Sequence, residues 1–310
     1  MTAPSLPPRA PAAPLAAHPH QELHEAISLW FSAAKRDLPW RDPQTSAWGV
    51  LVSEVMLQQT PVARVAPAWD AWMRAWPTPA DLAAASPADV LRAWNRLGYP
   101  RRALRLRECA AAIVAEHGGE VPASLPLLLA LPGVGEYTAA AVLTFAFGQR
   151  IVVLDTNVRR VLDRLVAGQA LPAPSLNNAE RQRAAALLPL NPPDAARWNI
   201  GVMELGALVC TAKNPDCGSC PVAQFCQWRA ADYPADEHAA RRRAQAWEGT
   251  DRQARGRVLA ALRRSDEPVA ADEIANLWPD AAQLARAVGS LLADGLIEPA
   301  DDDGALRLPR

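Results

Sequence analysis

Hydrophobic residues recur every three or four positions along most of this chain, the spacing that places them on one face of an α-helix. The pattern predicts helices over 22–34, 47–57, 62–75, 87–97, 101–116, 137–147 and 156–167. Short stretches with Pro, Gly or Asp separate these segments. The β-branched run IVVL at 151–154 is too short to indicate a sheet. We therefore predict an all-α chain up to about residue 230.

The sequence changes character beyond that point. A polar stretch rich in Arg and Ala, 231–254, is expected to be a linker. Helical patterns follow near 255–264, 270–278 and 280–294, and GLIEPADDDGALRLP then predicts a small hairpin. This order indicates a winged-helix-like α+β subdomain over 255–310, with a capping subdomain as the equal alternative. Three aspartates at the hairpin tip would repel phosphate, which argues against DNA binding by this piece alone.

The amino-acid composition and net charge exclude few classes of protein. The chain has 310 residues, is half hydrophobic and carries a net charge of −1, which neither indicates nor excludes nucleic acid, because a local stripe of arginine suffices. No apolar run approaches the roughly 20 residues of a membrane span. The Pro- and Ala-rich residues 1–20 are expected to be a disordered tail without a secretory signal. We expect a cytoplasmic protein with reduced thiols.

Four of the five cysteines lie in CTAKNPDCGSCPVAQFC, with the spacing C-x6-C-x2-C-x5-C: Cys210, Cys217, Cys220 and Cys226. A structural zinc site usually draws on two short knuckles that each give a close pair of ligands, and this segment has only one C-x2-C. Four thiolates from one compact loop suit a 4Fe–4S cluster. The spacing therefore favours the cluster over zinc, and disulfides least. Cys109 lies apart, on an apolar helix face, and is expected in the core.

The segment LPGVGEY at 131–137 predicts a tight turn between two helices. Gly133 and Gly135 are expected to let the backbone adopt positive φ and approach a ligand closely. The next helix is expected to begin near Tyr137, so its free N–H groups and positive dipole end would suit a phosphate oxygen. An ordinary glycine-capped helix connection is the alternative.

Two acidic residues stand at positions where a carboxylate needs an explanation. Glu54 interrupts the apolar segment LVSEVMLQQT at 51–60, where burial should raise its pKa, as a general acid near neutral pH requires. The alternative is a glutamate bonded to some buried donor. Asp155 precedes a predicted helix and is a natural N-cap. A capping carboxylate stays ionised, so capping is compatible with a catalytic role.

Several motifs occur in an order that resembles the helix-hairpin-helix DNA glycosylase superfamily, and most closely its MutY family of adenine DNA glycosylases. The motifs are LPWR at 38–41, SEVMLQQT at 53–60, LGY at 97–99, LPGVGEYTA at 131–139, LDTNVRRV at 154–161 and the four-cysteine loop. The resemblance covers about residues 22–230. It implies the glycosylase fold over 21–230, with a six-helix barrel over about 45–155 and a cluster domain formed by 21–44 and 156–230.

The resemblance also implies an activity: a monomer that removes adenine mispaired with 8-oxoguanine or guanine from double-stranded DNA. Glu54 would protonate the adenine, and Tyr137 and Asn157 would orient the reacting groups. Asp155 would stabilise the cationic sugar or bond to it covalently. The further implied contacts are the adenine pocket (Trp40, Arg41), the residues that fill the gap and hold the opposite base (Leu57, Gln58, Gln59, Tyr99) and the phosphate-binding hairpin (Leu131, Gly133, Val134, Gly135).

Tyr137 decides which kind of glycosylase the resemblance implies. Bifunctional relatives such as endonuclease III have a lysine at this position, which forms a Schiff base with the sugar. Tyrosine cannot do so, and the chain's two lysines, Lys35 and Lys213, lie elsewhere. We therefore predict a monofunctional enzyme.

Some positions depart from the usual pattern of the family. These are Pro100, Thr156 and Ile200, together with about eighty residues after Cys226 in place of the Nudix-like domain that recognises 8-oxoguanine. The preference for 8-oxoguanine over guanine therefore stays open.

Two other functions remain as alternatives. One is a thymine or uracil mismatch glycosylase of the same superfamily, which Gln58 and Gln59 disfavour. The other is a non-catalytic iron–sulfur protein that binds DNA or senses redox state, which the presence of both Glu54 and Asp155 disfavours.

Overall fold

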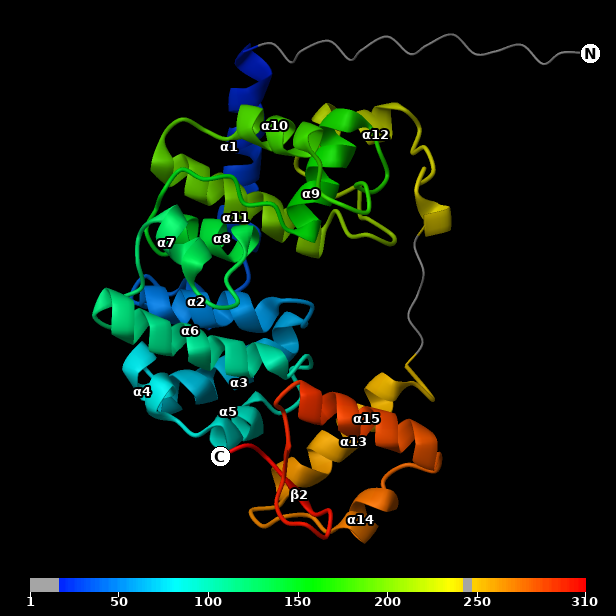
Figure 1. Ribbon diagram of the computed structural model, residues 1–310. Helices are drawn as coiled ribbons and strands as arrows, with labels where there is room; N and C mark the ends of the chain where they lie inside the picture. The colour runs from blue at the N-terminus through cyan, green and yellow to red at the C-terminus, as the bar shows by residue number, and fades with distance from the viewer. Residues whose placement is uncertain (1–16, 242–246) are drawn as a thin grey trace, which may run out of the picture. The chain divides into compact units, whose positions relative to one another are not determined.

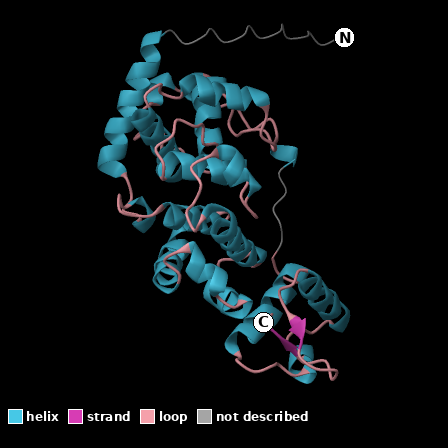
Figure 2. Cartoon of the chain, turned by 60° about the vertical axis from the view of Figure 1, so that its left-hand side comes forward, coloured by secondary structure: helices cyan, strands magenta, loops and turns pink. Residues whose placement is uncertain are grey.

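The computed structural model describes residues 17–241 and 247–310, whose regular secondary structure is helical apart from one short hairpin (Figures 1 and 2). The chain forms two compact units. One is built from the segment that ends at Arg36 and from Gly148–Arg243, and the other from Asp37–Phe147 and Ala244–Arg310. The all-α prediction is confirmed, and IVVL at 151–154 forms no strand. Among the described residues, no helix is long and apolar enough to cross a membrane.

The unit that contains Asp37–Phe147 is organised around helix α2 (Ala47–Leu57). Ser46 caps its start by accepting a hydrogen bond from the Gly49 N–H. All residues of α2 from Trp48 to Met56 are buried, as expected for a helix that is apolar all round. The other elements of this part are η1 (Pro39–Arg41), α3 (Val62–Ala75), α4 (Pro79–Ala84), α5 (Pro87–Trp94), α6 (Arg101–His117), α7 (Leu125–Ala130) and α8 (Glu136–Phe145).

The unit that contains Gly148–Arg243 packs helices around a second core, which includes Ile27, Trp198 and Leu205. Its elements are α1 (Ala17–Ala34), α9 (Thr156–Leu162), a π-helical turn η2 (Asp163–Ala167), α10 (Asn178–Leu187), α11 (Pro192–Leu208), η3 (Ala223–Phe225), α12 (Gln227–Ala230) and η4 (Ala239–Arg241). Helix α1 begins at Ala17, so four residues of the predicted tail are helical. The tail residues 1–16 lie outside the described residues, as do 242–246 of the predicted linker.

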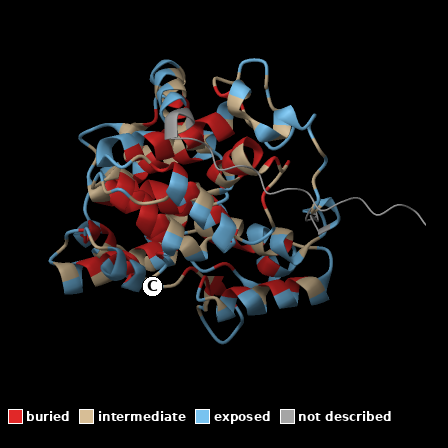
Figure 3. Ribbon diagram, turned by 90° about the horizontal axis from the view of Figure 1, so that it is seen from above, coloured by how far each residue is buried: buried red, intermediate tan, exposed pale blue. Residues whose placement is uncertain are grey.

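The C-terminal region follows the predicted order of three helices and a hairpin. Helix α13 (Asp251–Arg264) is followed by α14 (Ala271–Ala275) and α15 (Ala281–Ala293), and the antiparallel strands β1 (Glu298–Pro299) and β2 (Leu306–Arg307) complete it. An additional bridge pairs Val269, between α13 and α14, with Leu306. Figure 3 colours the buried residues of the chain red. The buried residues of the C-terminal region include Val258, Leu262 and Leu291. This is the order of elements predicted for a winged-helix-like subdomain.

Candidate active site and cluster-binding loop

Glu54 lies on the buried helix α2 and is only 4% exposed. The hydroxyl of Tyr137, in the first turn of α8, donates a hydrogen bond of 2.8 Å to Glu54 Oε2. Helices α2 and α8 pack against each other, which brings together two residues that are far apart in the sequence. The bond fixes the orientation of a carboxyl group that would otherwise be costly to bury.

The hairpin before α8 is only partly as predicted. Gly133 has φ +77°, and a Cβ added there would lie 3.1 Å from Arg105 Cβ. Gly135 has φ −97° and ψ 177°, so the prediction of positive φ was wrong for this glycine, which is extended and caps α8. A Cβ at Gly135 would meet no described atom within 4 Å, and no side chain of the described residues caps α8. The first turn of α8 is therefore accessible to a ligand.

The expected base-contacting residues lie on two loops. Gln58 and the exposed Gln59 follow α2, and Gln58 Nε2 donates to Thr138 Oγ1 on α8 at 3.3 Å. Tyr99 lies between α5 and α6 and is 47% exposed. Gln59 and Tyr99 have φ of 55° and 45°, a left-handed conformation that costs a residue with a Cβ roughly 1–2 kcal/mol. Other contacts must therefore stabilise these loops.

Arg102, on α6, supplies contacts to both loops. Its terminal nitrogens Nη1 and Nη2 donate to six oxygens: Val55 O (2.8 Å), Met56 O (3.3 Å), Gln58 O (2.7 Å), Thr60 Oγ1 (3.1 Å), Leu97 O (3.1 Å) and Gly98 O (3.1 Å). Burial lowers the pKa of Arg102 to about 10, so the guanidinium stays charged at neutral pH. Arg102 was not among the predicted site residues. The only signal was its place after LGY, in a segment with several other arginines.

The remaining predicted residues of this unit are mostly buried. Trp40 lies in η1 and contacts Trp69 edge-on, with 6.1 Å between ring centroids. Arg41 follows it and is half-buried, as is Leu57 at the end of α2. Leu131 and Val134 are buried in the hairpin, where the Val134 N–H donates to Leu131 O at 3.2 Å.

Asp155 is the N-cap of α9, as predicted. Its Oδ1 accepts from the Val158 N–H at 2.6 Å, and its Oδ2 accepts from Asn157 Nδ2 at 2.8 Å. Burial raises the pKa of Asp155 above its ordinary value, although these hydrogen bonds and the charge of Arg160 favour the carboxylate. The group is therefore partly buried and held by donors on both oxygens.

Arg160 connects Asn157 to the start of the cysteine loop. Its Nη2 donates to Asn157 Oδ1 at 2.8 Å and to Gly206 O at 2.6 Å, and its Nε donates to Cys210 O at 2.8 Å. A Cβ at Gly206 would lie 2.7 Å from Asn157 Cβ. Only glycine therefore allows α11 to approach α9 this closely.

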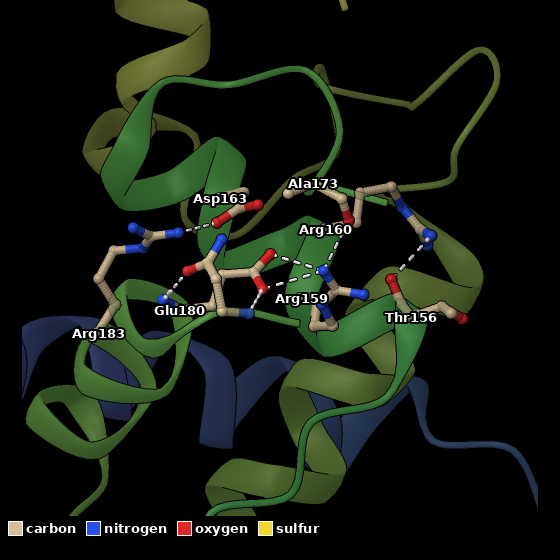
Figure 4. Close-up of polar contacts among 8 residues, drawn as sticks. Thr156, Arg159, Arg160, Asp163, Ala173, Glu180 and Arg183 are labelled. Atoms are coloured by element: carbon tan, nitrogen blue, oxygen red, sulfur yellow. Dashed lines mark hydrogen bonds and ion pairs between the residues drawn. The ribbon is translucent and has the colours of Figure 1, made fainter. Parts of the chain in front are cut away.

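Buried ion pairs hold α9 and η2 against α10 (Figure 4). Arg159 Nη2 donates to Glu180 at 2.8 and 3.0 Å and to Ala173 O at 2.8 Å. Arg183 pairs with Asp163. Removing one partner of such a pair typically costs about 3–5 kcal/mol, because a buried charge is left unpaired. These contacts stabilise the helix that Asp155 begins.

The four cysteines of the loop line one cavity together with Arg164 and Trp228. Arg164 Nη1 donates to Cys210 Sγ at 3.3 Å and to Thr211 O at 2.7 Å, and its guanidinium carbon lies 4.4 Å from the centroid of the Trp228 ring. Burial raises the pKa of the Cys220 thiol to about 11, and the other three cysteines add to the shift. Four adjacent thiolates therefore need a bound cation to be stable.

This donor set fits a 4Fe–4S cluster. Among the described residues, no three His, Cys, Asp or Glu side chains are grouped to hold a single metal ion. A cubane cluster differs from a single ion because each thiolate binds a different iron, so its four sulfurs lie farther apart. The four cysteines that line one cavity supply the four thiolates that such a cluster needs.

Comparison with known proteins gives the family. Residues 52–185 match the HhH-GPD superfamily of base excision DNA repair proteins, and residues 210–226 match the iron–sulfur binding domain of endonuclease III. An adenine DNA glycosylase of Mycolicibacterium smegmatis is 52% identical over 88% of this chain and 92% of its own length. The chain belongs to the adenine DNA glycosylase family. It is a base excision repair enzyme that acts on DNA, and its four-cysteine loop is the site of a 4Fe–4S cluster.

The matched length differs between the relatives of this glycosylase. The match to the Mycolicibacterium smegmatis enzyme covers so much of the chain that it must extend past Cys226 into the C-terminal region. An adenine DNA glycosylase of Homo sapiens is 45% identical over 66% of this chain and 39% of its own length.

Two solved structures have a fold similar to that of this chain. A thermostable thymine-DNA glycosylase has a TM-score of 0.62 at 27% identity and covers 68% of this chain and 97% of its own. A non-covalent endonuclease III–DNA complex has a TM-score of 0.60 at 22% identity and covers 70% of this chain and 98% of its own, a likeness of fold. The predicted helix-hairpin-helix glycosylase fold is confirmed.

Proposed function

We propose that this adenine DNA glycosylase removes adenine opposite 8-oxoguanine or guanine and leaves an abasic site without forming a Schiff base. The observation that carries the proposal is the hydrogen bond from Tyr137 to the buried carboxyl group of Glu54. It pairs a candidate acid with a residue that has no amine to attack the sugar. A buried, oriented carboxyl group is suited to transfer one proton to a bound base.

The reaction breaks the bond between adenine and the sugar. The target nucleotide is extruded from the duplex, and Glu54 gives its proton to N7 of adenine as the bonding electron pair leaves with the base. Asp155, held by Asn157, stabilises the positive charge that develops on the sugar. Water then adds to the sugar carbon and gives a proton to the carboxylate of Glu54, which restores the acid.

The other predicted residues bind the DNA around the lesion. The open first turn of α8, after Gly133 and Gly135, binds a phosphate oxygen through its backbone N–H groups. Gln59 and Tyr99 enter the gap left by the adenine. The supporting residues are Leu57 and Gln58 beside the gap, Leu131 and Val134 in the hairpin, and Trp40 and Arg41 around the adenine.

We further propose that the enzyme acts as a monomer on double-stranded DNA in the cytoplasm. The four free cysteines of the cluster loop support a reducing compartment, since oxidising compartments favour disulfides.

One panel of duplexes tests the proposed reaction. The purified protein is incubated with A opposite 8-oxoguanine, A opposite G, T opposite G and U opposite G, and the products are cleaved with alkali. We expect cutting only at adenine, and no strong covalent adduct when borohydride is added. The T and U duplexes are needed because a thymine/uracil-DNA glycosylase of Pyrobaculum aerophilum is 34% identical over 66% of this chain. Cutting at T or U, or an abundant adduct, would contradict the proposal.

Replacing Arg102 with methionine tests whether one side chain holds both base-contacting loops. Six oxygen atoms lose a charged donor, so the free energy of unfolding should fall by about 3 kcal/mol, and affinity for the mispair should fall at least tenfold. Thermal unfolding and fluorescence anisotropy with labelled duplexes measure the two effects.

Two variants control for charge and helix position. Arg102→Lys keeps the charge but lacks the planar fork, so it should restore little. Arg107→Met removes an arginine of the same helix that donates to Ala85 O, outside both loops, and should bind nearly as the parent does. Wild-type affinity in Arg102→Met would exclude the positioning role.

A further inference from the structure

Five side chains from two distant segments of the sequence form a row around Tyr99 in which aromatic rings and arginines alternate. The guanidinium carbon of Arg102 lies 5.2 Å from the centroid of the Trp94 ring and 5.6 Å from that of Tyr99. The guanidinium carbon of Arg252 lies 5.8 Å from the Tyr99 ring and 4.8 Å from the Trp247 ring. We call Trp94, Arg102, Tyr99, Arg252 and Trp247 the stacking ladder.

The stacking ladder leads from the protein core to its surface. Trp94 is fully buried, whereas Tyr99 and Trp247 are 47% and 48% exposed. Arg252 is exposed as well and belongs to the first turn of α13. Each contact of a guanidinium with an aromatic face is attractive. The C-terminal region therefore contributes the outer end of a surface whose middle member is the tyrosine expected to enter DNA.

The segment that carries Trp247 is fixed to α13. Thr250 caps the helix by accepting from the Gln253 N–H, and its hydroxyl donates to Trp247 O at 2.8 Å. The Gly249 N–H donates to Gln253 Oε1 at 2.9 Å. Trp247 and Arg252 are thus held in place by the start of the helix.

The C-terminal region also holds the backbone of the Tyr99 loop. Arg263, near the end of α13, donates from Nη1 to Asn95 O at 2.5 Å. Its Nε and Nη2 are buried without a hydrogen-bond partner among the described residues, and burial lowers its pKa to about 10. Asn95 and Tyr99 are the two left-handed non-glycine residues of this loop, with φ of 43° and 45°. A buried guanidinium therefore fixes a strained turn.

Further contacts hold the helices on either side of the loop. Before it, Arg92 on α5 donates to Ser265 O at 3.2 Å. After it, Arg101 on α6 pairs with Asp294 at 3.1 Å, and Asp294 also pairs with Arg255 of α13 at 2.6 Å. The loop is therefore held at both ends and at its turn by a region that follows it by more than 150 residues.

We propose that the C-terminal winged-helix-like region positions Tyr99 for entry into DNA, and that Arg252 and Trp247 extend the stacking surface of this tyrosine. The inference rests on the proposed role of Tyr99 in holding the base opposite the adenine. The surface used is the start of α13. The hairpin tip with Asp301, Asp302 and Asp303 takes no part, which agrees with the repulsion of phosphate expected there. Planar arginines and aromatic rings are the groups on which unpaired bases stack.

The test compares two duplexes that differ in what lies opposite the adenine. One has 8-oxoguanine there, and the other has a tetrahydrofuran abasic analogue, which gives Tyr99 no base to hold. The variants are Arg252→Ala, Trp247→Ala and Trp247→Phe. Arg257→Ala is the matched control, because Arg257 is an exposed arginine of the same helix outside the stacking ladder.

On the 8-oxoguanine duplex, Arg252→Ala and Trp247→Ala should each lower affinity and single-turnover rate about fivefold, the size expected for lost cation–π contacts. On the tetrahydrofuran duplex both variants should have the affinity of the wild type. Trp247→Phe keeps an aromatic face and should recover most of the loss. For Arg257→Ala, the affinity relative to the wild type should be the same on the two duplexes. Equal losses on the two duplexes would reduce the region to a structural or charge role and overturn the inference.

A double-mutant cycle supplies a second readout. In a Tyr99→Ala background, Arg252→Ala should cause a smaller loss on the 8-oxoguanine duplex than it causes in the wild type, because Arg252 stacks on Tyr99 and loses that support with it. Additive losses would contradict the inference. The two proposals fail differently: a wild-type enzyme inactive on every adenine duplex overturns the proposed function, whereas an active wild type with an unaffected Arg252→Ala variant overturns only the positioning role.

Discussion

Glu54→Gln is expected to lower the single-turnover rate of adenine removal by about 10³-fold, within the range that general acid catalysis contributes. Glutamine has nearly the shape of glutamate, and its carbonyl oxygen can still accept the hydrogen bond from Tyr137. Its amide cannot give a proton to the leaving base. The loss should therefore fall on chemistry and leave binding of the mispair within about twofold.

Rate and affinity must be measured on the same variant to test this assignment. Single-turnover cleavage with A opposite 8-oxoguanine gives the rate, and anisotropy with a duplex that carries a non-cleavable adenine nucleotide gives the affinity. Tyr137→Phe is the matched control: it removes the orienting hydroxyl and keeps the acid, so its rate should fall only about tenfold. If Glu54→Gln lost binding and rate equally, Glu54 would be structural.

Cys220→Ala is expected to remove the 4Fe–4S cluster altogether. A cubane needs four thiolates, and Cys220 lies in the cavity that the other three cysteines line. Bound iron should fall from about four atoms per chain to nearly none, and the broad brown absorption should disappear. Because metal binding contributes directly to folding, the melting temperature should fall as well.

Cys109→Ala provides the comparison within the same protein. Cys109 is buried in α6, outside the cluster cavity, so its loss should weaken packing but leave the iron content unchanged. Iron and acid-labile sulfide analysis, together with thermal unfolding, separate the two variants. A Cys220→Ala protein that kept its iron would remove Cys220 from the ligand set.

Local chemistry made part of the site predictable from sequence. Burial of Glu54 followed from the apolar residues around it, and the capping role of Asp155 followed from its place before a helix. Gly135 shows the limit of such reasoning: glycine permits positive φ, but it also suits an extended cap with open space beside it. Composition alone cannot distinguish these two uses of the residue.

Contacts between segments that lie far apart in the chain could not be predicted from the sequence. Nothing in the residues around Arg102 indicates that it faces six oxygens, because those oxygens belong mostly to backbone carbonyls, which carry no sequence signal. The contact of Arg263 with Asn95 O joins residues 168 positions apart, and no sequence pattern indicates it either. Helices α10 and α11 were not predicted individually either. Helix α10 (NAERQRAAAL) is too polar to show regularly spaced hydrophobic residues. The two prolines at the start of α11 interrupt the hydrophobic pattern expected of a helix.

The contacts of Arg102 also link the lengths of two loops. The segments 57–60 and 97–99 both depend on the same guanidinium, whose fork reaches a fixed set of carbonyls. One inserted residue would displace a carbonyl by up to about 3.5 Å, more than a hydrogen bond tolerates. Changes to the substrate range of this glycosylase by loop exchange must therefore transfer both loops and the arginine as one unit.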